Sequence, residues 1–343
     1  MFFMRFSMRS GAADASERAD SYRTALEMCA WAETRGCVAG VVSQHHAVDD
    51  GYLPSPVPMA AAIAARTDTL AVNVAALLLA LYEPVKLAED LAVVDLISRG
   101  RVSYVIGIGY REEELALFGV DRRRRAQLVE ERIGILRRLW SGETAEVDGR
   151  SAKVTPLPFT PGGPMLAYGG GTEAAARRAA RLGMFFLAET HDSSLEAAYM
   201  DEAAHRGVEP VGCFFAAGDV PSTVFVAEDP DRAWAEVGEY MLADATSYAR
   251  WNRGRSGTAS VSFAPTVAEL RAEHGAYQVL TPAEAASYVG RGISLALQPL
   301  VGGLPPDTAW RYLEAAASAS ATSATGSSRG GDGGASVGSG EQG

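Results

Sequence analysis

Cysteine is scarce in this sequence, and no run of apolar residues is long enough to cross a membrane. The 343 residues include three cysteines, Cys29, Cys37 and Cys213, which are too few and too scattered for a disulfide framework or a zinc site. The longest apolar run, residues 70–82, is shorter than the roughly 20 residues that a membrane-spanning helix needs. The first residues, MFFMRFSMRSG, lack the long apolar region and the cleavage site of a signal peptide. We therefore expect a cytoplasmic protein with no membrane contact.

Positive charge is also in short supply. Lys and Arg total 31 against 42 Asp and Glu, which gives a formal net charge of −11. A nucleic-acid-binding protein needs a broad positive face for the phosphate backbone, and this composition does not favour one. The one basic run, residues 122–125, is followed by Glu130 and Glu131 on a helical pattern, which is typical of a solvated helix face. Nucleic acid is therefore not an expected partner.

The composition changes abruptly after Ala317. Residues 318–343 are almost all Ser, Gly, Ala and Thr, with Val337 the only sizeable aliphatic residue. Such a segment cannot bury enough apolar surface to offset the entropy lost when it becomes ordered. We therefore expect a folded domain over residues 1–317 and a disordered tail over residues 318–343.

Short apolar segments alternate with segments of helical periodicity along residues 1–317. The apolar segments predict eight strands, at residues 2–7, 38–42, 70–79, 102–106, 165–168, 184–187, 223–226 and 294–298. Several of them are continuously apolar, which is typical of parallel strands covered on both faces. Eight strand–helix units predict an α/β fold, a (β/α)8 TIM barrel with insertions. A doubly wound sheet is the alternative.

Two helices and two insertions have clear signals. Leu87, Leu91 and Val94 repeat at helical spacing behind Pro84, and residues 129–140 carry a second stripe after the predicted N-cap Asp121. Residues 145–154, AEVDGRSAKV, predict a hairpin with an Asp-Gly turn. Residues 251–288, between the seventh and eighth strands, are expected to lie over an end of the barrel, where they could form a lid.

In a barrel, functional residues gather at the carboxyl ends of the strands. That rule selects residues 44–46, 73–76, 107–110, 169–172 and 189–191. His45 and His46 are adjacent, so on a strand their side chains point to opposite faces and cannot both bind one metal ion. Because no His-x-His spacing or further ligand cluster is present, no metal site is expected. One histidine then supports the strand end, and the other faces the barrel mouth, where an imidazole can move protons.

Two glycine-bearing turns follow predicted strands. In YGGGTEAAARRAARLG, residues 168–183, three glycines precede Thr172, which caps a helix. The free N–H groups and the positive end of the helix dipole make this turn an anion site suited to a phosphate, and a tight turn with an ordinary cap is the alternative. In GIGYREEE, residues 107–114, the glycines would let a flat ring approach the backbone, and a plain turn is the alternative.

These segments, in this order, resemble the bacterial luciferase-like, flavin-dependent oxidoreductase family. The clearest block runs from SQHH through RTDTLAVNVAALLLALYEPVKLAEDLAVVDLISRGRVSYVIGIGYREEELALFGVD to LVEERIGILRRLWSG, and YGGGTEAAARRAARLG follows it. The resemblance covers nearly everything from Phe6 to about Ala317. The family fold is a (β/α)8 barrel, which agrees with the strand pattern.

The resemblance implies a flavin cofactor. Members use reduced FMN as a diffusible co-substrate, or the related deazaflavin coenzyme, and in the monooxygenase branch reduced flavin and oxygen together oxidise a substrate in a dry pocket. By position, His45 corresponds to the catalytic histidine. The bond between Ala75 and Ala76 matches a non-proline cis peptide beneath the flavin ring. The cofactor-binding residues that the resemblance implies are Gln44, Val74, Ala75, Ala76, Gly107, Gly109, Tyr110, Gly169, Gly170, Gly171 and Thr172.

Two positions depart from the family pattern. Gln44 replaces the usual Glu, which removes a negative charge that would raise the pKa of His45. Ile108 stands where luciferases keep a phosphate-contacting arginine, so phosphate affinity would rest on backbone amides and Thr172, with Arg177 as an aid. Both departures bear on flavin affinity more than on the fold.

The expected function is a flavin-dependent monooxygenase that uses reduced FMN and O2 to oxidise a small organic substrate. No nicotinamide-binding motif is present, so reduced flavin would come from a separate flavin reductase. A homodimer is expected from the family alone. The alternatives are a deazaflavin-dependent hydride-transfer oxidoreductase on the same fold and, because of Gln44 and Ile108, a catalytically silent flavin-binding homologue.

Overall fold

Strands and helices alternate along the chain in the computed structural model, which describes residues 1–11, 13–190, 192–215, 220–252 and 261–326. The strands of the main sheet are β1 (Phe2–Phe6), β2 (Cys37–Val42), β3 (Ala71–Leu78), β4 (Val102–Gly107), β7 (Leu166–Gly170), β8 (Phe185–Ala188), β9 (Cys213–Phe215), β10 (Thr223–Val226), β11 (Tyr277–Leu280) and β12 (Leu295–Leu297). A separate hairpin consists of β5 (Ala145–Val147) and β6 (Arg150–Ala152). The helices are α1 (Ala15–Ala32), α2 (Pro56–Arg66), α3 (Pro84–Ser98), α4 (Glu112–Leu117), α5 (Arg125–Trp140), α6 (Glu173–Arg181), α7 (Ser194–Arg206), α8 (Pro230–Trp251), α9 (Val267–Ala272), α10 (Pro282–Gly290) and α11 (Pro306–Gly326). Two short 3-10 helices are η1 (Leu79–Leu81) and η2 (Val301–Gly303).

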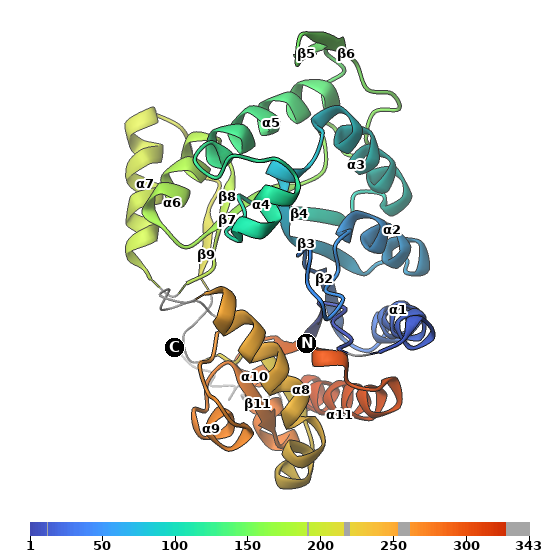
Figure 1. Cartoon of the computed structure of the whole chain (residues 1–343). Coiled ribbons are helices and arrows are strands. Elements are labelled where there is room, and N and C mark those ends of the chain that lie inside the picture. Colours follow the sequence, from blue (N-terminus) through green and yellow to red (C-terminus); the bar gives the residue numbers. More distant parts are fainter. Residues whose placement is uncertain (12, 191, 216–219, 253–260, 327–343) are drawn as a thin grey trace, which may run out of the picture.

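The main sheet is parallel, and its strand order is β11-β10-β12-β1-β2-β3-β4-β7-β8-β9. The last strand, β12, lies beside the first, and helices lie on the outside of the strands (Figure 1). A doubly wound sheet reverses its order at a switch point, whereas here the strands from β1 to β9 follow one another in sequence. The predicted barrel-like α/β fold is therefore confirmed. Within the described residues, strand pairing does not join β9 to β11, so the barrel has a seam between them.

All eight predicted strands are present, and their ends differ from the prediction by at most two residues. The prediction missed β9 and β11, which have three and four residues. β11 belongs to the segment expected to lie over an end of the barrel, yet it joins the sheet beside β10, with Tyr277 opposite Thr223. That expectation is wrong for this part of the segment, and residues 253–260 lie outside the described residues.

The apolar faces predicted for α3 and α5 point inward. Leu87 of α3 and Ile133 of α5 are buried, as their spacing predicts. The predicted cap of α5 is wrong, because the N-cap is Arg124 and not Asp121. The Asp121 carboxylate instead accepts a hydrogen bond from the backbone N–H of Arg123 at 2.8 Å, which closes the turn ahead of the helix.

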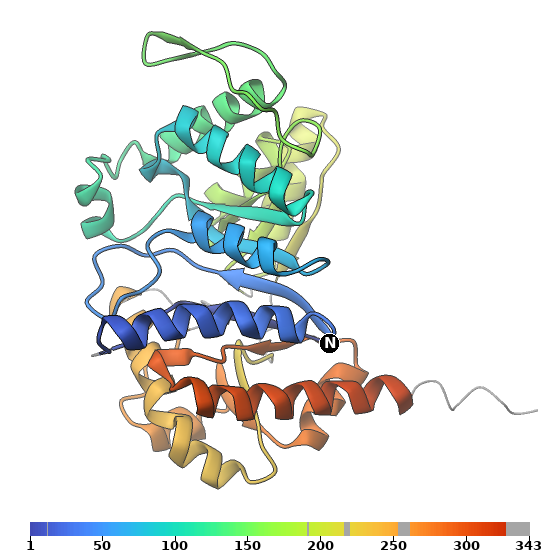
Figure 2. The same cartoon turned by 90° about the vertical axis from the view of Figure 1, so that its right-hand side faces the viewer.

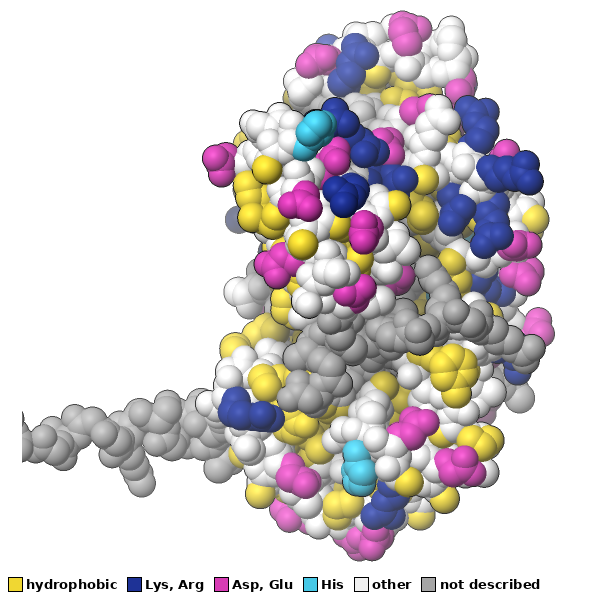
Figure 3. Space-filling view, turned by 90° about the vertical axis from the view of Figure 1, so that its left-hand side faces the viewer, with side chains coloured by type: hydrophobic (Ala, Val, Ile, Leu, Met, Phe, Trp, Pro, Cys, Tyr) yellow, Lys and Arg dark blue, Asp and Glu magenta, His cyan; other side chains and the backbone are white. Residues whose placement is uncertain are grey.

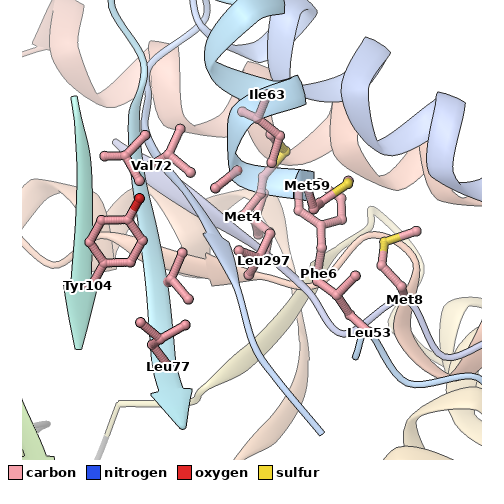
Figure 4. Packing of buried hydrophobic residues seen from close by; sticks show 14 of the residues in the cluster. Met4, Phe6, Met8, Leu53, Met59, Ile63, Val72, Leu77, Tyr104 and Leu297 are labelled. Carbon is pink, nitrogen blue, oxygen red and sulfur yellow. The ribbon is translucent and has the colours of Figure 1, made fainter. Parts of the chain in front are cut away.

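The core between the sheet and α2 holds the strands in place. Figure 4 shows Met4 and Phe6 of β1 beside Met59 and Ile63 of α2, with Leu297 of β12 next to them. All five side chains are buried. Burying one large apolar side chain contributes about 1.5–3 kcal/mol, so this cluster stabilises the strands whose carboxyl ends carry the candidate site.

Residues 145–154 form the predicted hairpin. β5 pairs antiparallel with β6, with Ala145 opposite Ala152. Asp148 (φ 50°) and Gly149 (φ 72°) both have positive φ, as a two-residue type I′ turn requires. The hairpin projects from the barrel beyond α5 (Figures 1 and 2).

The outer surface of the molecule is mixed in charge where Figure 3 shows it. On the side that carries α6 and α7, acidic and basic side chains are interspersed, with hydrophobic side chains between them (Figure 3). Among the described helices, none is both long enough and apolar enough to cross a bilayer.

Helix α11 runs past the boundary predicted at Ala317. It continues to Gly326, and within it Ala319 and Ser320 are only 5% and 4% exposed. Once a helix has formed, each added residue gains a backbone hydrogen bond at little cost, so small residues such as Ala and Ser extend it readily. The predicted start of the disordered tail at residue 318 is therefore too early, and residues 327–343 lie outside the described residues.

We expect a chain that ends at Ala317 to be less stable than a chain that ends at Gly326. The shorter chain loses the buried Ala319 and Ser320 together with the last turns of α11. Its Tm should be lower by about 2–4 °C, the shift that a loss of about 1 kcal/mol produces in a large domain. Calorimetry on the two chains measures the difference, and equal Tm values would contradict the packing of this helix end.

Candidate functional site

A cavity of about 560 Å³ lies at the carboxyl ends of the barrel strands. This volume is in the range of pockets that bind small molecules and cofactors. The predicted site residues that line it are Gln44, His45, Ala75, Ala76, Gly107, Gly109, Tyr110, Gly169, Gly170, Gly171 and Thr172. The structure does not bring Val74 to the cavity, because its side chain is fully buried in the hydrophobic core. Glu189 also lines the cavity, whereas His191 lies outside the described residues.

One wall of the cavity carries almost no side chains. Ala75 and Ala76 near the end of β3 line it together with Gly107, the last residue of β4, and Gly109 just after it. A Cβ atom on Gly107 would lie 2.9 Å from the Cβ of Ala76, so no larger residue fits there. Gly109 has φ +73°, a conformation that favours glycine. The Ala75–Ala76 peptide bond is cis, as the resemblance implies. The wall is therefore a strip of bare backbone whose shape suits a planar ring.

The glycine turn at the end of β7 is packed tightly against its neighbours. A Cβ atom on Gly170 would lie 2.6 Å from the Cβ of Ala175, and one on Gly171 would lie 2.8 Å from Cγ2 of Thr190. Packing alone therefore requires glycine at both positions. Thr172 caps α6, because its Oγ1 accepts a hydrogen bond from the backbone N–H of Ala175 at 3.3 Å. The structure therefore shows a tight turn with an ordinary cap at the edge of the cavity, and the phosphate site stays a prediction.

Two arginines line the cavity and were not identified from the sequence. Arg125 begins α5 and Arg178 lies in α6. The Nε of Arg178 donates to Oε1 of Glu130 at 2.6 Å, and the Nε of Arg125 donates to the backbone oxygen of Gly109 at 3.0 Å. Ile108 lines the same cavity. The cavity is thus lined by arginine side chains from two helices, although residue 108 is an uncharged isoleucine.

His45 is buried at the cavity with a partner on each ring nitrogen. Its Nδ1 lies 2.8 Å from Oε1 of Glu114, and its Nε2 lies 3.4 Å from the hydroxyl of Tyr110. The ring packs edge-on against Tyr52 and at a tilt against Trp251, with centroid separations of 4.8 Å and 4.6 Å. The structure therefore places the predicted catalytic histidine in the cavity and adds Glu114, which the sequence shows only as one acid in an acidic helix start.

The environment of His45 favours a neutral imidazole. Burial lowers the pKa of His45 below its ordinary value, the hydrogen bond and charge of Glu114 act to raise it, and the charges of Arg111 and Arg9 lower it further. Burial acts to raise the pKa of Glu114, but its hydrogen bonds and the charges of His45 and Arg111 lower it overall. A neutral imidazole beside an ionised carboxylate is the arrangement that results.

Gln44 contacts His46 and not His45. Its Oε1 accepts the backbone N–H of Leu78 at 2.9 Å, which fixes the orientation of the side-chain amide. The amide Nε2 then donates to Nε2 of His46 at 2.7 Å, so this imidazole nitrogen carries no proton. Burial also lowers the pKa of the half-buried His46. The negative charge that Gln44 lacks is supplied to His45 by Glu114.

A buried arginine forms the layer behind His45. The Nε of Arg9 lies 3.0 Å from Oδ1 of Asp244, and a second ion pair joins Arg9 to Asp50. The guanidinium also lies over the rings of Tyr52 and Trp251, each 4.7 Å from the ring centroid. These residues come from three separate segments of the chain, around residues 9 and 50–52 and in α8, so no sequence motif marks the cluster.

The two adjacent histidines have different partners, as their positions on a strand end predict. His45 is bound to Glu114, and His46 is bound to Gln44. In the part of the chain that the structure describes, no group of three or more His, Cys, Asp or Glu side chains is placed to hold a metal ion.

In enzymes with a parallel barrel, the active site lies at the carboxyl ends of the strands, where this cavity is found. The family can be assigned as well, since residues 1–318 match the family described as luciferase-like monooxygenase. The chain belongs to this family. The cis peptide bond between Ala75 and Ala76 agrees with the resemblance noted in the sequence. Gly107 and His45, which the resemblance also names, both line the cavity.

Solved structures of similar fold cover almost the whole chain. The monooxygenase RslO1 from Streptomyces bottropensis has a TM-score of 0.68 at 23% identity, with 93% of this chain and 98% of that chain covered. The oxygenating constituent of 3,6-diketocamphane monooxygenase from Pseudomonas putida, in complex with FMN, has a TM-score of 0.70 at 18% identity, with 94% and 98% covered. An F420-dependent secondary alcohol dehydrogenase has a TM-score of 0.59 at 15% identity, with 92% and 98% covered. At these identities the likeness shows the fold.

Relatives in sequence match a shorter part of the chain. An uncharacterized protein of Mycobacterium tuberculosis is 33% identical over 132 residues, which is 36% of this chain and 47% of that protein. The oxygenase component of a flavin-dependent trigonelline monooxygenase from Acinetobacter baylyi is 28% identical over 145 residues, 41% and 40% of the two chains. The alkanal monooxygenase alpha chain of Photorhabdus luminescens is 29% identical over 125 residues, 35% of each chain. The matches thus span less than half the length of these relatives.

Replacing Gly170 with Ala should destabilise the protein, whereas replacing Gly134 with Ala should not. The new Cβ at position 170 would overlap Ala175 and push α6 away, at a cost of about 1–3 kcal/mol. Gly134 lies within α5 with nothing within 4 Å of its Cβ position, so Ala there should be neutral or stabilise by up to about 1 kcal/mol. Urea unfolding of both variants measures the contrast, and equal stabilities would contradict the tight turn.

Proposed function

We propose that this protein is a monooxygenase that uses reduced FMN and O2 to oxidise a small organic substrate. The observation that carries the proposal is one cavity of about 560 Å³ with a bare backbone wall, a capped helix N-terminus and a buried histidine around it. Membership of the luciferase-like monooxygenase family supports the proposal. A relative named as the oxygenase component of a flavin-dependent monooxygenase and a structural neighbour in complex with FMN support it further.

The residues around the cavity fit FMN in shape and in charge. The planar ring would lie along the wall at Ala75, Ala76 and Gly107, where no side chain is larger than a methyl group. The phosphate would be held by N–H groups at the start of α6, by Thr172 and by the guanidinium of Arg178. When bound, reduced FMN supplies the electrons that activate O2, and the protein orients the reactants and excludes water.

His45 would act on the substrate or on oxygen at the cavity. Its ring is neutral because burial lowers its pKa, so one nitrogen is able to accept a proton near neutral pH. Tyr52 and Trp251 cover the ring, which keeps bulk water away from it. The apolar and aromatic surroundings favour a substrate with little charge near this end of the cavity.

Three partners belong to the proposal. Reduced FMN would come from a separate flavin reductase, because the relative from Acinetobacter baylyi is named as the oxygenase component of its monooxygenase. O2 and a small organic molecule would be the other reactants. We also propose a cytoplasmic location, because of the scarcity of cysteine, and a homodimer, on the family grounds given in the sequence analysis.

The second candidate is hydride transfer with a deazaflavin coenzyme. It is favoured by the structural neighbour named as an F420-dependent alcohol dehydrogenase, whose TM-score is 0.59. Hydride transfer needs no oxygen. Oxygen uptake with an added flavin reductase, NADH and FMN therefore separates the two candidates. Oxygen uptake that accompanies substrate oxidation supports the monooxygenase. No oxygen uptake, together with substrate turnover by the deazaflavin coenzyme, supports hydride transfer.

Replacing His45 with Ala should lower kcat by about 10²–10⁴-fold while Tm stays close to that of the wild type. The side chain is lost from the cavity, where it can move a proton, and the space that remains lies next to the existing cavity. His205, exposed in the last turn of α7, provides the matched control, and its replacement by Ala should change nothing. Substrate turnover in the coupled assay measures the effect, and an unchanged kcat in the His45 variant would remove it from the mechanism.

Replacing Arg178 with Met should weaken FMN binding by about tenfold or more, because a charge-assisted hydrogen bond to phosphate is lost. Riboflavin, which has no phosphate, should bind equally well to the variant and the wild type. Arg177 is the control: its side chain is 41% exposed, pairs with Glu173 and does not line the cavity. Calorimetric titration gives both affinities. Equal losses for FMN and riboflavin would mean that Arg178 does not contact the phosphate.

A further inference from the structure

We propose that Glu114 is a positioning residue that holds His45 in one tautomer, with the proton on Nδ1 and the basic nitrogen, Nε2, toward the cavity. The inference rests on the proposed function, in which His45 acts on a group bound in that cavity. Nothing in the sequence separates Glu114 from Glu112 and Glu113, its neighbours at the start of α4.

The contact geometry assigns the protons. Oε1 of Glu114 lies 2.8 Å from Nδ1 of His45, a distance that requires a hydrogen atom between them. The same oxygen accepts the backbone N–H of His46 at 2.7 Å and Nη1 of Arg111 at 3.0 Å, and all three contacts favour the ionised carboxylate. The proton must therefore belong to Nδ1 of His45, which leaves a lone pair on Nε2.

The cavity side of the ring agrees with this assignment. The hydroxyl of Tyr110 lies 3.4 Å from Nε2 of His45 and lines the cavity. Burial raises the pKa of Tyr110, so the hydroxyl keeps its proton and is able to donate it in a hydrogen bond to Nε2. In a proton transfer, Nε2 would accept the proton from an O–H group of a bound molecule. One N–H bond forms as one O–H bond breaks, and the resulting imidazolium is stabilised by the carboxylate of Glu114.

A substitution can separate a purely structural role of Glu114 from its role in positioning His45. The other carboxylate oxygen of Glu114, Oε2, is buried and has no hydrogen-bond partner. In the variant Glu114→Gln, the amide oxygen can therefore keep all three hydrogen bonds of Oε1 while the NH2 group takes the place of Oε2. The substitution removes the negative charge and preserves the acceptor that holds Nδ1–H.

Other charged and titratable groups also face His45, and they set the direction of the expected change. They are Glu114 and Arg111 near α4, Arg9 after β1, His46 beside it on the chain, and the hydroxyls of Tyr52, Tyr110 and Tyr248. Burial lowers the pKa of His45, the charges of Arg111 and Arg9 add to the lowering, and Glu114 opposes it. Removing the charge of Glu114 should therefore lower this pKa further and make Nε2 a weaker base.

The test uses unliganded protein labelled with 15N in histidine. Long-range 1H–15N spectra report which ring nitrogen carries the proton, and the signals of His45 are assigned by their loss in His45→Gln. The wild type should show the Nδ1–H tautomer. In Glu114→Gln the tautomer should persist, and the titration midpoint of His45 should move to lower pH. Glu113→Gln, which removes an exposed charge from the same helix, should leave both unchanged.

Turnover provides the second readout. In Glu114→Gln, kcat should fall by about 10–100-fold with KM nearly unchanged, and the acid limb of the pH profile should move to lower pH. Glu114→Asp keeps the charge and should retain more activity than Glu114→Gln, which also covers the case in which the Gln variant folds poorly. An Nε2–H tautomer in the wild type, or an unchanged titration in Glu114→Gln, would overturn the inference. Because the spectra need no flavin, a protein that shows the expected tautomer but oxidises nothing would refute the proposed function and leave the role of Glu114 in place.

Discussion

One buried carboxylate oxygen joins the segment that carries the histidines to the segment before α4. Oε1 of Glu114 binds the imidazole of His45, the backbone of His46 and the guanidinium of Arg111. A buried charge is stable only when such partners surround it, and breaking a buried pair typically costs about 3–5 kcal/mol. Oε1 of Glu114 therefore holds its three donors close to one another. The position of His45 at the cavity depends on this oxygen. The opposite side, with its bare backbone wall, depends on close packing instead.

A second layer of charge and aromatic surface supports this arrangement. Arg9 lies over the rings of Tyr52 and Trp251 and is paired with Asp50 and Asp244. These rings are the same ones that cover His45. His45 is thus enclosed by aromatic rings, and the buried ion pair between Arg9 and Asp244 lies behind these rings. This arrangement explains how His45 is buried although it lies at the mouth of the barrel.

The sequence predicts the barrel and most of the cavity, because both arise from local patterns. Apolar runs identify the strands, and barrel topology brings strand ends such as His45 and Gly170 together. Glu114 could not be found in this way, since it is one of three consecutive acids and its role depends on contact with a strand end 68 residues away. Val74 illustrates the opposite case, because the strand was predicted correctly but the direction of its side chains depends on how the strand sits in the closed sheet.

The close packing of the glycine turn has a consequence for how such a site diversifies. A side chain at Gly170 would overlap Ala175 and move α6, and one at Gly171 would displace the side chains of Thr190 and Glu189. In the proposed site, where this turn holds the phosphate, a new side chain in the loop would therefore disturb its neighbours. Arg125 and Arg178 lie on helices outside the loop, so the proposed affinity for an anion could be altered at these two positions while the loop itself stays unchanged.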